Sequence, residues 1–121
     1  MVFAVSALLG LCIAVIHATA GGRGIGRPLV QPQTLSPTVT LTHSHSWHMA
    51  TICLVVLAGC YAYEAVSPDG RILAAVATLV PGAFCVWGLV RAVWKRQRHR
   101  DMPQQVRFLA LTGSGIWALA A

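Results

Sequence analysis

Histidine is the residue with the richest chemistry in this sequence, and it is concentrated beside apolar segments. His43, His45 and His48 lie in the stretch "THSHSWHMATICL" (residues 42–54), and His17 lies near the end of an earlier apolar segment. Imidazole titrates near neutral pH and binds transition metals and haem iron. Three kinds of chemistry therefore fit these residues: metal or haem ligation, proton transfer, and hydrogen bonding between helices.

A metal or haem site is the most specific of these hypotheses. Haem would take His17 and His48 as its two axial ligands, and a transition metal would take His17, His45 and His48. The spacing of these histidines matches no known ligand motif. The sequence therefore predicts no cofactor and no catalytic residue, so the protein is expected not to be an enzyme. Haem or a transition metal is the alternative.

The composition indicates that these histidines belong to a membrane protein. Of the 121 residues, 56% are hydrophobic and 10% are charged, and the mean hydropathy is +0.67. Soluble domains carry about a quarter charged residues. Most of the net charge of +6 lies in one stretch beside an apolar segment, which is typical of a topology signal. We therefore expect the lipid bilayer as the partner, and no nucleic acid.

Four apolar segments predict an all-α integral membrane protein, with four transmembrane helices in one antiparallel bundle (residues 1–121). About 20 apolar residues are needed to cross the hydrocarbon core, so the fourth helix is short. The turn "SPDG" (residues 67–70) joins the second and third helices as a hairpin. The expected helices cover about residues 2–20, 47–66, 72–94 and 106–121.

A long cytoplasmic loop is expected over residues 21–46. Glycines at its start end the first helix, and Pro28, Pro32 and Pro37 prevent a continuous helix. Proline lacks the backbone N–H that a helix interior needs, and its ring collides with the preceding turn. The loop therefore separates His17 from the later histidines in the sequence, although both ends of the loop lie on the same side of the membrane.

Basic residues predict the orientation of the chain. Loops rich in lysine and arginine stay in the cytoplasm, so both termini are placed outside an inner (plasma) membrane. The first loop carries Arg23 and Arg27. The stretch after the third helix carries four more basic residues, which suit anionic lipid head groups: Lys95, Arg96, Arg98 and Arg100.

Small residues predict how the first two helices pack. The first helix has a stripe of small residues at intervals of four: Ser6, Gly10, Ala14 and Ala18. The second helix is expected to present another such stripe: His48, Thr51, Val55, Gly59 and Ala62. Small residues let helix backbones approach closely in a membrane. We therefore expect the two stripes to meet, with a polar lock and packing contacts made by His17, His48, Thr51, Gly10 and Gly59.

The start of the second helix also carries a resemblance. The residues that carry it are His17, Pro28-Leu29, and the motif W-H-x-x-T formed by Trp47, His48 and Thr51. In these residues the first half of the chain resembles a family of small, uncharacterised bacterial four-helix inner-membrane proteins. The resemblance implies the four-helix topology and the pair of histidines, and it implies no activity.

The sequence thus favours a small structural or accessory component of a membrane complex, with other membrane subunits or further copies of the chain as partners. One alternative is a redox or metal-binding membrane protein that uses His17 and His48. The other is a small transporter, in which Glu64 or the histidines would face a water-filled cavity.

Overall fold

The computed structural model describes residues 1–27, 36–94 and 104–121, and nearly all of these residues are helical. No strand occurs in these three ranges, so the predicted all-α class is confirmed. The elements follow in the order α1 (Val2–Ile16), η1 (His17–Gly26), α3 (Pro37–Val66), η2 (Pro68–Gly70), α4 (Arg71–Trp94) and α5 (Gln104–Ala120).

The first helix is longer than predicted. The sequence places its end near Ala20, but a π-helical segment, η1, continues the backbone to Gly26. A helical glycine costs about 1 kcal/mol relative to alanine. Packing opposes this cost, because a Cβ on Gly21 would lie 3.0 Å from the Trp47 ring. The glycines therefore admit a neighbouring ring instead of ending the helix.

The second helix begins ten residues before the predicted start. Pro37 occupies the first turn of α3, where its missing N–H is tolerated, and the Ser36 side chain accepts a hydrogen bond from the backbone N–H of Val39 at 3.4 Å. The predicted loop over residues 21–46 is therefore wrong at both ends. Pro28, Leu29 and Pro32 lie outside the described residues. At 30 residues, α3 is about 45 Å long.

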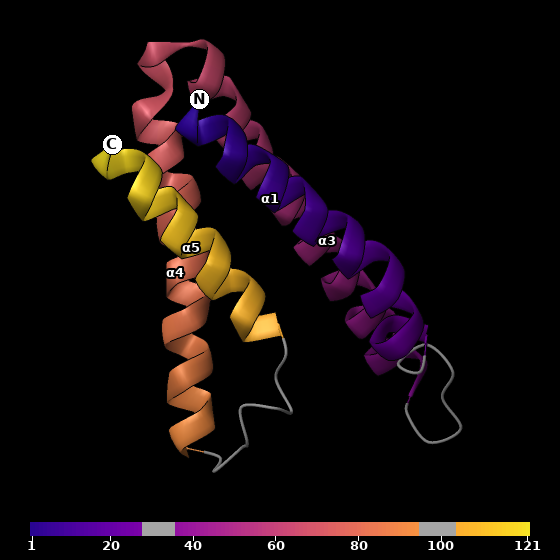
Figure 1. Cartoon of the computed structure of the whole chain (residues 1–121). Helices are drawn as coiled ribbons and strands as arrows, with labels where there is room; N and C mark the ends of the chain where they lie inside the picture. The colour runs from indigo at the N-terminus through magenta and orange to yellow at the C-terminus, as the bar shows by residue number, and fades with distance from the viewer. Residues whose placement is uncertain (28–35, 95–103) are drawn as a thin grey trace.

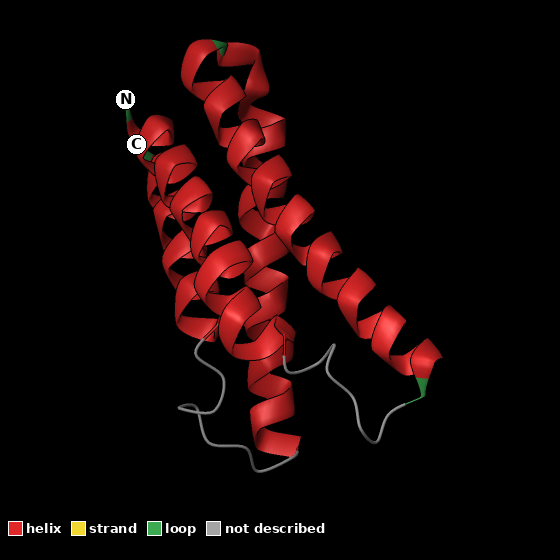
Figure 2. Cartoon of the chain, turned by 90° about the vertical axis from the view of Figure 1, so that its right-hand side faces the viewer, coloured by secondary structure: helices red, strands yellow, loops and turns green. Residues whose placement is uncertain are grey.

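The helices associate as two pairs. α1 packs against α3 and α4 against α5, with further contacts of α1 with α5 and of α3 with α4. Both termini lie at the same end as the turn between α3 and α4, and the two pairs diverge toward the other end (Figure 1). The start of α3 extends away from the other helices (Figure 2).

Small residues form the crossing point of the two pairs. A Cβ on Gly10 would lie 3.2 Å from the Cβ of Ala58 and 3.6 Å from Leu111, so α1 touches α3 and α5 here. On α1, Ser6, Gly10 and Ala14 are buried, whereas Ala18, which lies in η1, is exposed. The core around this crossing consists of Ile13, Ala14, Leu54, Leu57, Tyr61, Ala74, Ala77 and Leu111.

The pair formed by α4 and α5 is held by aromatic and small residues. The rings of Phe84 and Phe108 meet edge to face, with centroids 5.3 Å apart. A Cβ on Gly82 would lie 3.4 Å from the methyl group of Thr112. The neighbouring Pro81 is buried, and α4 continues as a helix on both sides of it.

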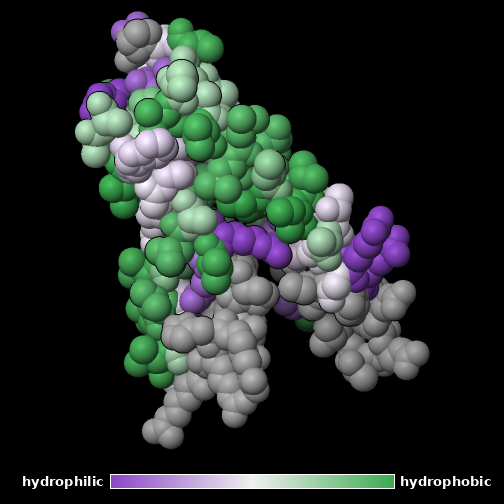
Figure 3. All heavy atoms as spheres, viewed as in Figure 1, coloured by the Kyte–Doolittle hydropathy of each residue, from purple (hydrophilic) through white to green (hydrophobic). Residues whose placement is uncertain are grey.

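Three helices are long and apolar enough to cross a membrane: Val2–Gly24, Pro37–Val66 and Arg71–Trp94. On the face seen in Figure 3, the surfaces that these helices present are largely hydrophobic. Large apolar side chains such as Leu8, Ile52 and Leu79 are more than half exposed, which is the pattern expected when lipid replaces water as the solvent. The structure therefore fits the predicted membrane protein.

We predict that Gly10→Leu lowers the free energy of unfolding by about 1–3 kcal/mol, because the new side chain collides with Ala58 and Leu111. Gly59→Leu is the matched control, since Gly59 has open space around its Cβ position. It should change stability by less than about 0.5 kcal/mol. Denaturant titration of purified protein in detergent measures both. Equal effects of the two substitutions would contradict the close approach at Gly10.

Candidate functional site

His17 is the centre of a cluster that joins α3 to the end of the first helix. Its imidazole stacks on the Trp47 ring, with centroids 4.1 Å apart and planes inclined by 15°. Its Nδ1 lies 3.0 Å from Thr51 Oγ1. Gly21 completes the contact by leaving room for the Trp47 ring. These four residues are called the His17 cluster below.

The hydrogen bonds of Thr51 determine which imidazole nitrogen carries the proton. Thr51 Oγ1 donates its only proton to the backbone carbonyl of Trp47 at 3.2 Å. It can then only accept from His17, so Nδ1 carries a hydrogen. In the neutral ring, the lone pair is left on Nε2. This nitrogen is the atom of His17 that could bind a metal ion, while Thr51 would fix the ring orientation.

The face of α3 that meets α1 differs from the predicted one. The observed contacts come from Trp47, Thr51 and Ala58, and Leu54 and Tyr61 are buried on the same side of α3. Apart from Thr51, each member of the predicted stripe lies one residue after a member of the observed face. One residue turns a helix by about 100°. The exposed members of that stripe are His48, Val55, Gly59 and Ala62. The expected meeting of His17 with His48 is therefore not what the structure shows.

The remaining predicted ligands also lie away from His17. His43 and His45 are exposed on the early turns of α3, and His45 lies three residues before the exposed His48, so these two lie on neighbouring positions of the helix surface. Among the residues described, no group of three or more His, Cys, Asp or Glu side chains is placed to hold a metal ion. The predicted lipid contacts Lys95, Arg96, Arg98 and Arg100 lie outside the described residues.

A second polar contact, missed from the sequence, joins α3, α4 and α5. The hydroxyls of Tyr61 and Thr78 are 2.9 Å apart and buried. Thr78 donates to the carbonyl of Ala74 at 2.8 Å, so Tyr61 donates to Thr78. A Cβ on Gly115 would collide with both hydroxyl oxygens. The signal was available, because Tyr61 and Thr78 flank the predicted hairpin turn at similar distances along the chain.

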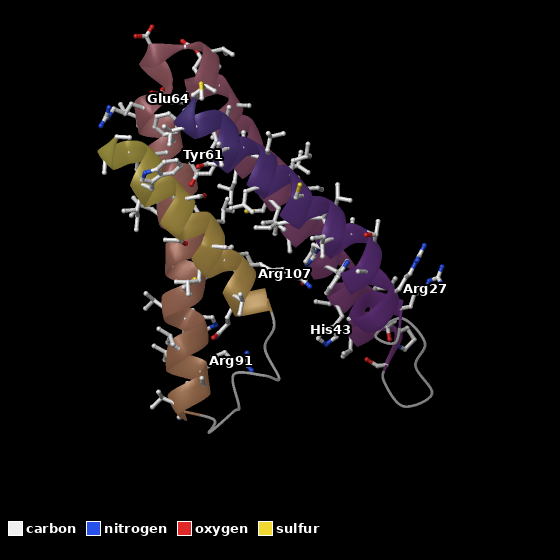
Figure 4. All side chains as sticks on the ribbon, in the orientation of Figure 1. Arg27, His43, Tyr61, Glu64, Arg91 and Arg107 are labelled. Carbon is white, nitrogen blue, oxygen red and sulfur yellow. The ribbon has the colours of Figure 1, made fainter. Side chains whose placement is uncertain are left out.

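The charged side chains lie at the two ends of the molecule. Arg71 donates to the carbonyl of Leu119 at 2.6 Å and so fastens the end of α5 to the start of α4. One carboxylate oxygen of Glu64 is buried without a hydrogen-bond partner among the residues described, and it lies close to Gly70. At the other end, Arg107 points from α5 toward the α1–α3 pair (Figure 4).

No protein-family model matches the chain, and no match is found among curated proteins or solved structures.

We predict that His17→Ala lowers the free energy of unfolding by about 1–2 kcal/mol, through loss of the ring stack and the hydrogen bond. His48→Ala should change it by less than about 0.5 kcal/mol, since His48 is exposed. A double-mutant cycle of His17→Phe with Thr51→Val should give a coupling energy of about 0.5–1.5 kcal/mol. A larger loss for His48→Ala than for His17→Ala would restore the pairing predicted from the sequence.

The Tyr61–Thr78 contact predicts an asymmetry between two conservative substitutions. Thr78→Val leaves the buried Tyr61 hydroxyl without an acceptor and should cost about 1–3 kcal/mol. Tyr61→Phe should cost less, about 0.5–1.5 kcal/mol, because Thr78 keeps its bond to Ala74. Thermal or denaturant unfolding in detergent measures the order. The reverse order would show that Tyr61 has another acceptor.

Proposed function

We propose that this protein is a multi-pass inner-membrane protein with a structural or accessory role in a membrane complex. The observation that carries the proposal is the use of its interior polar groups. His17 with Thr51 and Tyr61 with Thr78 bind each other across helix interfaces, and Arg71 binds the end of α5. These bonds hold helices together, as hydrogen bonds between membrane helices do. The outward surfaces remain apolar and available to lipid or other subunits.

We further propose an antiparallel bundle in which α5 is the fourth, short transmembrane helix. α5 has 17 residues and is about 26 Å long, slightly less than a hydrocarbon core of about 30 Å. Its contacts with α4 and α1 support this placement, since a short helix can cross a membrane in the shelter of its neighbours.

The proposed orientation places both termini outside and the basic end in the cytoplasm. Arg27, Arg91 and Arg107 lie toward one end of the molecule, and Glu64 lies toward the other (Figure 4). The termini lie at the end that carries Glu64 (Figure 1). The positive-inside rule, which assigns basic residues to the cytoplasmic side, supports this orientation.

Redox or metal chemistry is the alternative function. It would use Nε2 of His17, or the exposed neighbours His45 and His48 together with ligands from another copy of the chain. Purified protein with a haem absorption band, or with stoichiometric metal that is lost in His17→Ala or His48→Ala, would replace the accessory role by this one. A transporter would instead show liposome flux that depends on Glu64 or the histidines.

We expect the protein, solubilised from native membranes in a mild detergent, to migrate with an assembly larger than its own mass of 12.9 kDa. Deleting the protein should lower the abundance of the other subunits of that assembly, and His48→Ala should restore it as wild type does if the role needs no redox chemistry. Quantitative proteomics of the membrane fraction measures this. Migration as a free monomer, with unchanged abundance of all other membrane proteins after deletion, would contradict the accessory role.

A further inference from the structure

Arg107 is a charged side chain in an unusual position. It lies in the first turn of α5, is only partly exposed, and extends into the region between the two helix pairs (Figure 4). It has no hydrogen bond or ion pair with any residue that the structure describes. An ionisable group at membrane depth normally pairs with a partner of opposite charge.

The nearest described functional groups cannot supply that charge. His17 is a base and carries no negative charge, and Thr51 is neutral. Glu64 and Asp69, the acids among the described residues, lie at the opposite end beside the turn between α3 and α4. Arg91, exposed on α4 at the same end as Arg107, adds further positive charge. Among the residues that the structure describes, an external anion would therefore supply the missing negative charge.

We propose that the basic end between the α1–α3 pair and the α4–α5 pair binds a phosphate group, with Arg107 as its principal contact and Arg91 as a second. The planar guanidinium donates parallel hydrogen bonds that match two phosphate oxygens. The source of the phosphate is the head group of an anionic phospholipid, because the site opens between apolar helix surfaces at the level of the membrane interface. Hydrophilic side chains are visible between these surfaces (Figure 3). The site does not depend on the accessory role proposed above.

The test uses the full-length protein in detergent, titrated with phosphatidylglycerol or with phosphatidylcholine. Thermal unfolding measures stabilisation by each lipid, and native mass spectrometry measures how much lipid the protein retains. Wild type should bind phosphatidylglycerol preferentially. Arg107→Gln should weaken that binding about tenfold, through loss of a charge-assisted bidentate contact. Arg23→Gln is the matched control, since Arg23 is exposed at the end of η1, and it should bind as wild type does.

A second variant and a second ligand complete the test. If Arg107→Gln does not fold, Arg107→Lys keeps the charge but loses the bidentate geometry, and it should weaken binding several-fold. Titration with inorganic phosphate separates the sources of the anion. A saturable shift that phosphate alone produces, and that Arg107→Gln removes, would retain the phosphate site and overturn the lipid assignment. Equal binding of the two lipids with no response to phosphate, or unchanged binding in both Arg107 variants, would overturn the site itself.

Discussion

The close approach of α1 to α3 at Gly10 is the constraint on which the rest of the structure depends. A Cβ at this position would lie 3.2 Å from that of Ala58, so the two helices are in contact at their backbones. Seven residues forward along α1 and seven back along α3 lead to the hydrogen bond of His17 with Thr51. Four more residues in each direction lead to the contact between Gly21 and Trp47. A single register thus positions the whole His17 cluster.

The sequence predicted the α1 side of this interface but not the α3 side, and the reason is geometric. Small residues mark the face of α1 correctly down to Ala14. The same rule applied to α3 selects Val55 and Gly59, whereas the structure buries Leu54 and Ala58 one position earlier. A small stripe on one helix leaves room for larger side chains on its partner, so two small stripes need not face each other. The error of one residue turns His48 by about 100° away from His17.

Some helix boundaries could be predicted from the local sequence, and others depend on tertiary contacts. Ser36 followed by Pro37 is a recognisable start of a helix, and it could have placed the start of α3 correctly. The continuation of the first helix through its glycines could not be predicted, because it depends on Trp47 from a distant segment packing against Gly21. The all-helical class and the apolar segments follow from composition, since they need no knowledge of tertiary contacts. The contact of Tyr61 with Thr78 is a tertiary contact that the sequence could still have predicted, because the register of the hairpin brings the two residues together.

The polar bonds between helices hold the two helix pairs together at one end of the molecule more than at the other. The bond of Arg71 to Leu119 and the Tyr61–Thr78 contact fasten α3, α4 and α5 near the end that carries the turn. Toward the basic end the pairs diverge, and the bond of His17 with Thr51 lies there within the α1–α3 pair (Figure 1). Among the described residues, Gly10 is where α1 contacts both α3 and α5, and Arg107 lies between the pairs on the basic side of that contact (Figure 4). An anion that neutralises the charge of Arg107 would join the two pairs at the end where they diverge, and so add a link like the one that the Tyr61–Thr78 contact makes near the turn.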